Sequence, residues 1–147
     1  MKKLLIQANN LDTVVDVFMF IHLHPGCKKQ DIADYCGFTL RQVDYYTNAC
    51  KYLDLIDSKW ASTELATDIF QNSPAEVTER VYKRIIEDEV IGKIYAKLQS
   101  EPDSYPSDYA KMLVESYFPG YSNAVYDRRS DNMIKWCKKI MNYFSDK

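Results

Sequence analysis

The last stretch of the chain constrains the fold class more than any other feature. Apolar residues and one arginine recur there at gaps of three and four residues, the spacing that places side chains on one face of an α-helix. The positions are Val125, Arg129, Met133, Trp136, Ile140 and Phe144. Ser122 precedes this stripe and has a side chain suited to cap a helix. The pattern predicts a long capped helix and a mainly α protein.

The first half of the chain predicts three helices in close succession. Asp12 can cap the first helix, and Pro25-Gly26 ends it. A second helix is expected from Lys28 to Tyr35, followed by Gly37, a residue suited to the left-handed conformation. Thr39 then caps a third helix. This order of helix, short helix, glycine-containing turn and helix is typical of a helix-turn-helix motif.

The segment from Leu55 to Thr63 is too short and too interrupted for a helix. It predicts two short strands with a turn near Asp57–Lys59, and a hairpin at this place would form a wing. A breaker, Gln71-Asn72-Ser73-Pro74, then marks a boundary, and the second half repeats the helical plan. We therefore expect a mainly α fold with small β wings, made of two tandem winged-helix (helix-turn-helix) units. The expected domains are residues 1–72 and 73–147.

Charge and hydropathy exclude two classes of protein. The 147 residues include 19 basic and 21 acidic side chains, a net charge of −2, whereas proteins that coat polyanions are strongly basic. The longest apolar run, Val17–Ile21, has five residues, far fewer than the roughly 20 of a membrane span. Polar residues such as Gln7 and Asp12 interrupt any signal-peptide core. The sequence predicts a cytoplasmic protein with no membrane partner.

The chain shows no pattern that supports catalysis. None of its four cysteines pairs at the two-residue gap of a zinc knuckle, and His22 and His24 would point to different faces of a helix. The four glycines stand singly, so no glycine-rich phosphate loop is present. We expect a protein that is not an enzyme, with no catalytic residue, metal or cofactor.

The start of the expected third helix is the first candidate contact surface. If Val43, Tyr46 and Cys50 face inward, the exposed side carries Arg41, Gln42, Tyr45 and Asn48. In a helix-turn-helix, the N-terminal part of this helix meets base edges. Arginine can pair with guanine, and glutamine or asparagine with adenine, through two hydrogen bonds each. An ordinary polar helix face is the alternative interpretation of the same residues.

The last helix supplies a second candidate surface. Residues 128–147 hold six basic and two acidic side chains, whereas residues 54–90 hold four basic and nine acidic ones. Such segregation suits a DNA-binding surface on an acidic protein. Arg128 is expected to point outward and Arg129 to be partly buried. The full candidate set for DNA is Lys28, Lys29, Thr39, Arg41, Gln42, Tyr45, Asn48, Lys59, Ser122, Asn123, Tyr126, Arg128 and Arg129.

Two runs of residues carry a family resemblance. They are Arg41-Gln42-Val43-Asp44-Tyr45-Tyr46-Thr47-Asn48-Ala49 and Lys51-Tyr52-Leu53-Asp54-Leu55-Ile56. With Ser122, Arg128, Arg129 and Trp136 in the second half, the chain resembles the tandem winged-helix DNA-recognition modules of type II (type IIS and nicking) restriction endonucleases. Asp54 and Ala66 stand where that family has glycine. The resemblance implies sequence-specific binding of double-stranded DNA without catalysis.

The context of DNA binding and the class of the protein both stay open at this stage. The DNA-binding protein is either a recognition module working with a nuclease domain or subunit, or a small transcriptional regulator. A protein of another class, an assembly module that uses the same fold without DNA contact, also fits, because fold alone does not determine function. A homodimer is compatible with both.

Overall fold

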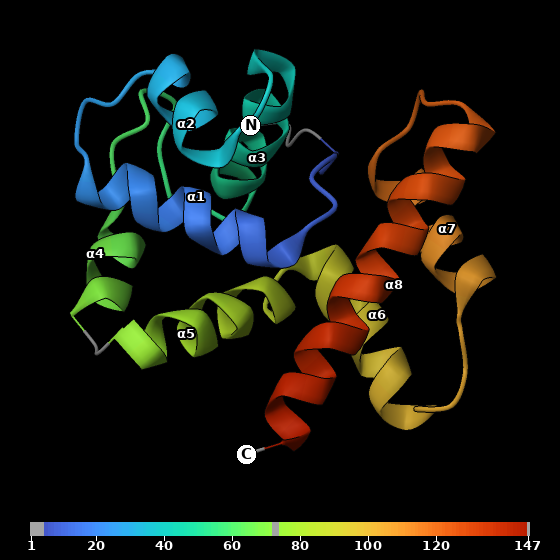
Figure 1. Cartoon of the computed structure of the whole chain (residues 1–147). Helices are drawn as coiled ribbons and strands as arrows, with labels where there is room; N and C mark the ends of the chain where they lie inside the picture. Colours follow the sequence, from blue (N-terminus) through green and yellow to red (C-terminus); the bar gives the residue numbers. More distant parts are fainter. Residues whose placement is uncertain (1–4, 72–73, 147) are drawn as a thin grey trace. The chain divides into compact units, whose positions relative to one another are not determined.

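The computed structural model describes residues 5–71 and 74–146 (Figure 1). The chain divides into two compact units, Met1–Val81 and Tyr82–Lys147, which are described separately below. The predicted boundary between residues 72 and 73 falls outside the described residues.

The described residues form eight helices. The first unit contains α1 (Leu11–Leu23), α2 (Lys29–Cys36), α3 (Leu40–Tyr52) and α4 (Glu64–Phe70). Helix α5 (Pro74–Ile86) crosses the division between the units. The second unit contains α6 (Glu89–Ser100), α7 (Ser107–Tyr117) and α8 (Asn123–Ser145).

In the first unit, α3 packs against both α1 and α2 (Figure 1). Val14 and Phe18 of α1, Ile32 of α2 and Val43 of α3 are fully buried. Cys50 donates from Sγ to the Val14 carbonyl oxygen at 3.8 Å. Burying a large apolar side chain contributes about 1.5–3 kcal/mol, so this interior holds the short helix α2 in place. The outward faces of α2 and α3 are thereby fixed.

The connection from α2 to α3 is a tight turn. Gly37 has φ 71°, in the left-handed region that favours glycine, and the Phe38 amide donates to the Ala33 carbonyl at 2.9 Å. Thr39 then begins α3, because its hydroxyl accepts the Gln42 amide at 3.2 Å. The predicted turn and cap are both confirmed here.

The prediction of β wings, and with it the tandem winged-helix fold, is wrong. Between α3 and α4 the described chain shows a single isolated antiparallel bridge, Ile56 to Ser62, and no strand appears elsewhere in residues 5–71 or 74–146. The Asp57 carboxylate accepts the Lys59 and Ala61 amides at 2.8 and 2.9 Å. A side chain that satisfies local amides competes with strand pairing. Trp60 has φ 64°, which also breaks an extended strand.

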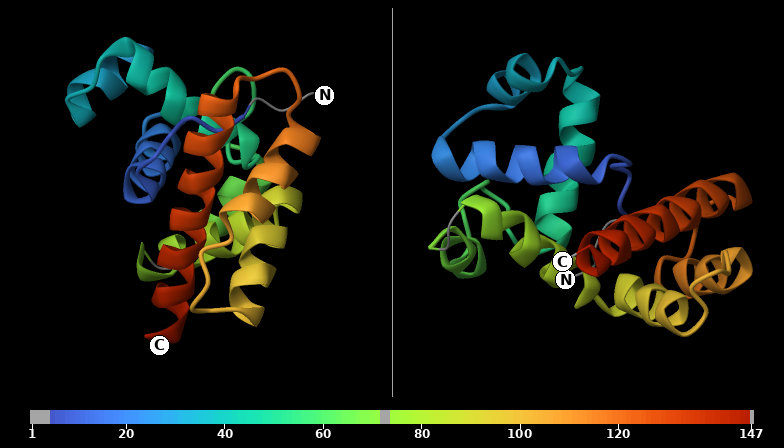
Figure 2. Two further views of the ribbon diagram at one scale, coloured as in Figure 1. Left: turned by 90° about the vertical axis from the view of Figure 1, so that its right-hand side faces the viewer. Right: turned by 60° about the horizontal axis from the view of Figure 1, so that its bottom comes forward.

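In the second unit, α8 packs along both α6 and α7 (Figure 2). Met133, Trp136 and Ile140 from the predicted stripe are buried. The buried Asp88 begins α6 by accepting the Val90 and Ile91 amides at 3.1 and 3.0 Å. None of the helices described is both long and apolar enough to cross a membrane.

Candidate nucleic-acid interface

Helix α3 separates its buried and outward side chains cleanly. Val43, Tyr46 and Cys50 are buried. Arg41 is exposed, and Tyr45 and Asn48 are half-exposed. Positions 41, 45 and 48 are separated by four and three residues, so they share one helical face. We call Arg41, Tyr45 and Asn48 the α3 outer face.

Arg41 and Tyr45 form a pair on this face. Arg41 Nε donates to the Tyr45 hydroxyl at 2.6 Å, and the guanidinium carbon lies 5.7 Å from the centre of the Tyr45 ring. The bond uses one of the five guanidinium N–H groups. The terminal nitrogens keep the paired donors that match a guanine edge.

Two predicted contact residues instead hold the start of α3. The Gln42 Oε1 atom accepts the Thr39 amide at 3.0 Å, while the Thr39 hydroxyl accepts the Gln42 amide. This reciprocal arrangement is a capping box. Because reading adenine needs both the oxygen and the nitrogen of an amide, the engaged Oε1 removes Gln42 from direct base contact in this conformation.

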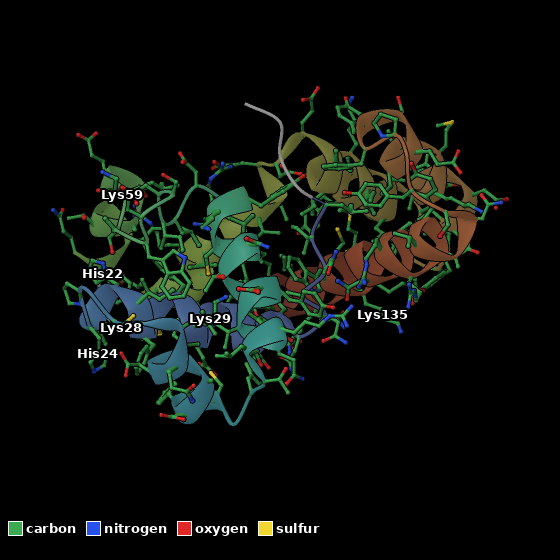
Figure 3. All side chains as sticks on the ribbon, turned by 90° about the horizontal axis from the view of Figure 1, so that it is seen from above. His22, His24, Lys28, Lys29, Lys59 and Lys135 are labelled. Carbon is green, nitrogen blue, oxygen red and sulfur yellow. The ribbon has the colours of Figure 1, made fainter. Side chains whose placement is uncertain are left out.

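The three predicted lysines of the first unit have different surroundings. Lys29 forms an ion pair with Asp44 of α3, at 2.7 Å between Nζ and Oδ1. Lys28 is exposed at the N-cap of α2, where its amide donates to the Asp31 carboxylate at 2.8 Å. Lys59 lies in the Asp57 turn, well away from Lys28 and Lys29 (Figure 3). Lys29 is therefore the lysine that contacts α3, whereas Lys28 is the exposed lysine at the start of α2.

The predicted contact residues at the start of α8 also include both exposed side chains and side chains that hold the local structure. The Ser122 hydroxyl accepts the Val125 amide at 3.3 Å and caps the helix, and Asn123 is exposed. Tyr126 is 5% exposed. Its hydroxyl donates to the Phe118 carbonyl at 2.6 Å and accepts the Tyr121 amide at 3.1 Å. Tyr126 therefore holds the turn before α8, which corrects its predicted place on the contact surface.

Acidic side chains surround the basic residues of α8. Arg128 is exposed and Arg129 half-buried, as expected. Arg128 lines an open cavity of about 370 Å³ together with Lys111 and three carboxylates, those of Asp108, Asp127 and Asp131. Because the carboxylates outnumber the cations, the cavity does not favour a phosphate.

The neighbouring lysines are also engaged within the second unit. Asp131 pairs with Lys135 at 3.1 Å and accepts a hydrogen bond from the Tyr105 hydroxyl. Burial and the adjacent Asp131 raise the pKa of Tyr105 to about 12. Lys138 donates to the Ser104 carbonyl at 3.2 Å. Lys135 and Lys138 are thus engaged within the second unit, and the α3 outer face is the stronger candidate.

Two of the described cysteines, Cys50 and Cys137, are buried within the helices. Burial raises the pKa values of Cys50 and Cys137 to about 12, so these thiols stay protonated near neutral pH. Among residues 5–71 and 74–146, no group of three or more His, Cys, Asp or Glu side chains is arranged to hold a metal ion.

Two aromatic clusters that contain histidine were not predicted from the sequence. His22 Nδ1 lies 2.8 Å from the Ser62 hydroxyl, and the His22 ring stacks on Phe70 at 3.8 Å between centroids. Phe20 stacks against His24, which caps the end of the same helix, and against Tyr35 of α2. The four-residue spacing of Phe20 and His24 was a visible signal, whereas the partners from α2 and α4 depend on tertiary packing.

Comparison with known proteins places the chain in a family. No curated protein and no solved structure matches it. A family model matches residues 13–145, which include all eight helices apart from the first two residues of α1. The chain belongs to the family described as a domain of unknown function, DUF7226.

Proposed function

We propose that this protein binds double-stranded DNA in a sequence-dependent manner through the α3 outer face. The observation that carries the proposal is the Arg41–Tyr45 pair. The hydrogen bond at Nε and the Tyr45 ring restrict the guanidinium, while its terminal nitrogens remain available. A side chain already held near its bound geometry loses less entropy on binding.

The position of this pair within its helix supports the same function. Arg41 is the second residue of α3, and helices that enter the major groove contact bases with their N-terminal residues. The tight turn at Gly37 places α2 directly before α3, with Lys28 exposed at the start of α2. Lys28 would contact the DNA backbone and Arg41 would contact a base.

The surrounding charge defines the expected strength of binding. Asp44 neutralises Lys29, so Lys28 and Arg41 are the predicted contact residues of α2 and α3 that offer a cation to phosphate. Each phosphate contact contributes about 0.9 to the slope of log affinity against log salt concentration. A small slope follows, and specificity must come mainly from base contacts.

The proposal extends to the context in which the protein works. The likeness of residues 41–56 to restriction-enzyme recognition modules favours a recognition protein without catalysis of its own, acting with a nuclease domain or subunit in the cytoplasm. A small transcriptional regulator would use the α3 outer face in the same way. Both contexts require DNA binding first.

The direct test is fluorescence anisotropy of labelled random-sequence duplex DNA at about 50 and about 200 mM salt. We expect micromolar binding at low salt that weakens at high salt. Lys28→Ala should reduce the salt slope by about one. Lys97→Ala, which removes a cation paired with Glu101 in the second unit, should leave the titration unchanged. Absence of binding at low salt would contradict the proposal.

A further inference from the structure

Helices α1 and α2 of the first unit present three stacked rings at the surface. The Phe20 ring centroid lies 4.3 Å from that of His24 and 4.7 Å from that of Tyr35, with interplanar angles of 25° and 27°. Tyr35 is 62% exposed, and His24 projects from the end of α1 (Figure 3). His24 Nδ1 donates to the Phe20 carbonyl at 2.9 Å, which fixes the His24 ring in the stack.

An open cavity of about 400 Å³ lies beside these rings, and it is acidic. Phe20, His24 and Cys27 line it together with Asp31 and Asp34. The two carboxylates are three residues apart on α2, so they share a face. The cavity thus combines aromatic faces with two anionic groups.

Neither carboxylate is neutralised by a cation of the described chain. Asp31 accepts the Lys28 amide at 2.8 Å, and Asp34 accepts the Gln30 side-chain amide at 2.8 Å. Each hydrogen bond engages one carboxylate oxygen and leaves the second oxygen to accept a bond from a ligand. Burial of the Cys27 thiol raises its pKa, and the negative charge of Asp31 raises it further. Burial and the charge of Asp16 raise the pKa of the nearby Cys36 in the same way. The local potential is therefore negative.

We propose that this cavity, which we call the aromatic–acidic pocket, binds an arginine side chain of a protein partner. A guanidinium stacks on aromatic faces and accepts no hydrogen bonds, whereas its planar donors match carboxylates in pairs. The inference goes beyond DNA binding and does not depend on it, since it uses residues outside the α3 outer face.

The test is anisotropy of the full chain with a labelled arginine-containing peptide and with its twin in which citrulline replaces arginine. Citrulline keeps the shape but not the charge. We expect the arginine peptide to bind at least about tenfold more tightly than the citrulline peptide. In a two-dimensional NMR spectrum, it should shift the amide of Gly26, which also lines the pocket.

Variants separate the pocket from diffuse charge attraction. Asp34→Asn and His24→Ala, which alter two residues that line the pocket, should each weaken peptide binding about fivefold. Asp103→Asn removes the same charge from an exposed position in the second unit and should have no effect. Because His24 is exposed and follows the end of α1, His24→Ala should keep the wild-type circular dichroism spectrum.

Three results would overturn the inference. One is equal binding of the arginine and citrulline peptides. Another is equal weakening by Asp34→Asn and Asp103→Asn, which would indicate general attraction to an acidic protein. The third is self-association that Tyr35→Ala abolishes while the peptide fails to bind, which would assign the ring stack to a second copy of the chain.

Discussion

Arg41 Nε donates a 2.6 Å hydrogen bond to the Tyr45 hydroxyl, one turn further along α3. The two side chains project from the face opposite the buried Val43 and Tyr46. Exposed arginines usually sample many rotamers, and holding one costs side-chain entropy. The hydrogen bond to Tyr45 already restricts the arginine side chain before a ligand binds, so less side-chain entropy is lost on binding. This relationship is the basis of the proposed DNA-binding role.

The end of α3 yields a prediction about stability. Asp54 follows the helix with φ 62°, a conformation that glycine adopts without steric cost. Asp54→Gly should therefore stabilise the first unit by roughly 0.5–1 kcal/mol, the net of relieved strain and lost chain entropy. The measurement is the urea midpoint. Asp54→Ala removes the charge but keeps Cβ, so a gain of equal size in that variant would contradict the explanation.

Asp54 also illustrates what the sequence could provide. The motif resemblance pointed to glycine at this position, and the structure shows the backbone conformation that glycine would serve. Spacing and caps likewise located α3 and the buried stripe of α8. These features depend on neighbours within a few residues, which is why local patterns suffice to find them.

The errors have a common origin in interactions that sequence spacing does not encode. Asp57 takes the amides that a wing hairpin would have paired. Asn10, instead of Asp12, caps α1 by accepting the Thr13 amide at 3.1 Å. For the candidate site, the engagement of Gln42, Lys29 and Tyr126 depends on which partner each side chain finds. The helical face predicts whether a side chain is exposed, but it does not predict which hydrogen-bond or ion-pair partner that side chain finds.

Tyr126 predicts a stability effect in the second unit. Tyr126→Phe leaves the Phe118 carbonyl and the Tyr121 amide without their hydroxyl partner. Losing a buried hydrogen bond in this way costs about 1–3 kcal/mol, so the melting temperature should fall while DNA affinity stays unchanged. Tyr121→Phe is the matched control, because Tyr121 is 39% exposed, whereas Tyr126 is buried. An unchanged melting temperature for Tyr126→Phe would show that its hydroxyl is not needed for the turn.

Gly92 marks a close approach between α5 and α6. A Cβ atom at this position would lie 2.6 Å from the Ile86 carbonyl oxygen, closer than real Cβ contacts allow. Gly92→Ala should destabilise the protein by about 1–3 kcal/mol, because backbone must shift to admit the methyl group. Thermal unfolding measures the effect, with the exposed Gln99→Ala as control. Equal melting temperatures for the two variants would refute the close contact.

His22 predicts a loss of stability in mild acid. Burial lowers its pKa below the ordinary value of 6.5. As the pH falls through about 6.5, the unfolded chain takes up the proton before the folded chain does. The stabilising contribution is therefore present above that pH and lost below it. Urea midpoints at about pH 7.5 and 5.5 measure the change, and His22→Gln should make it smaller. An equal pH dependence in the variant would assign it to other groups.

The most direct test of the central claim is selection of a preferred sequence from a random duplex library, followed by titration of that site and a scrambled duplex. Arg41→Ala should lose roughly 1–3 kcal/mol on the selected site and little on the scrambled one. Arg41→Lys keeps the charge but not the planar donors, so it should lose nearly as much specificity. Tyr45→Phe should lose less, about 0.5–1.5 kcal/mol. Failure to enrich any sequence, or equal losses on both duplexes, would contradict base recognition by the α3 outer face.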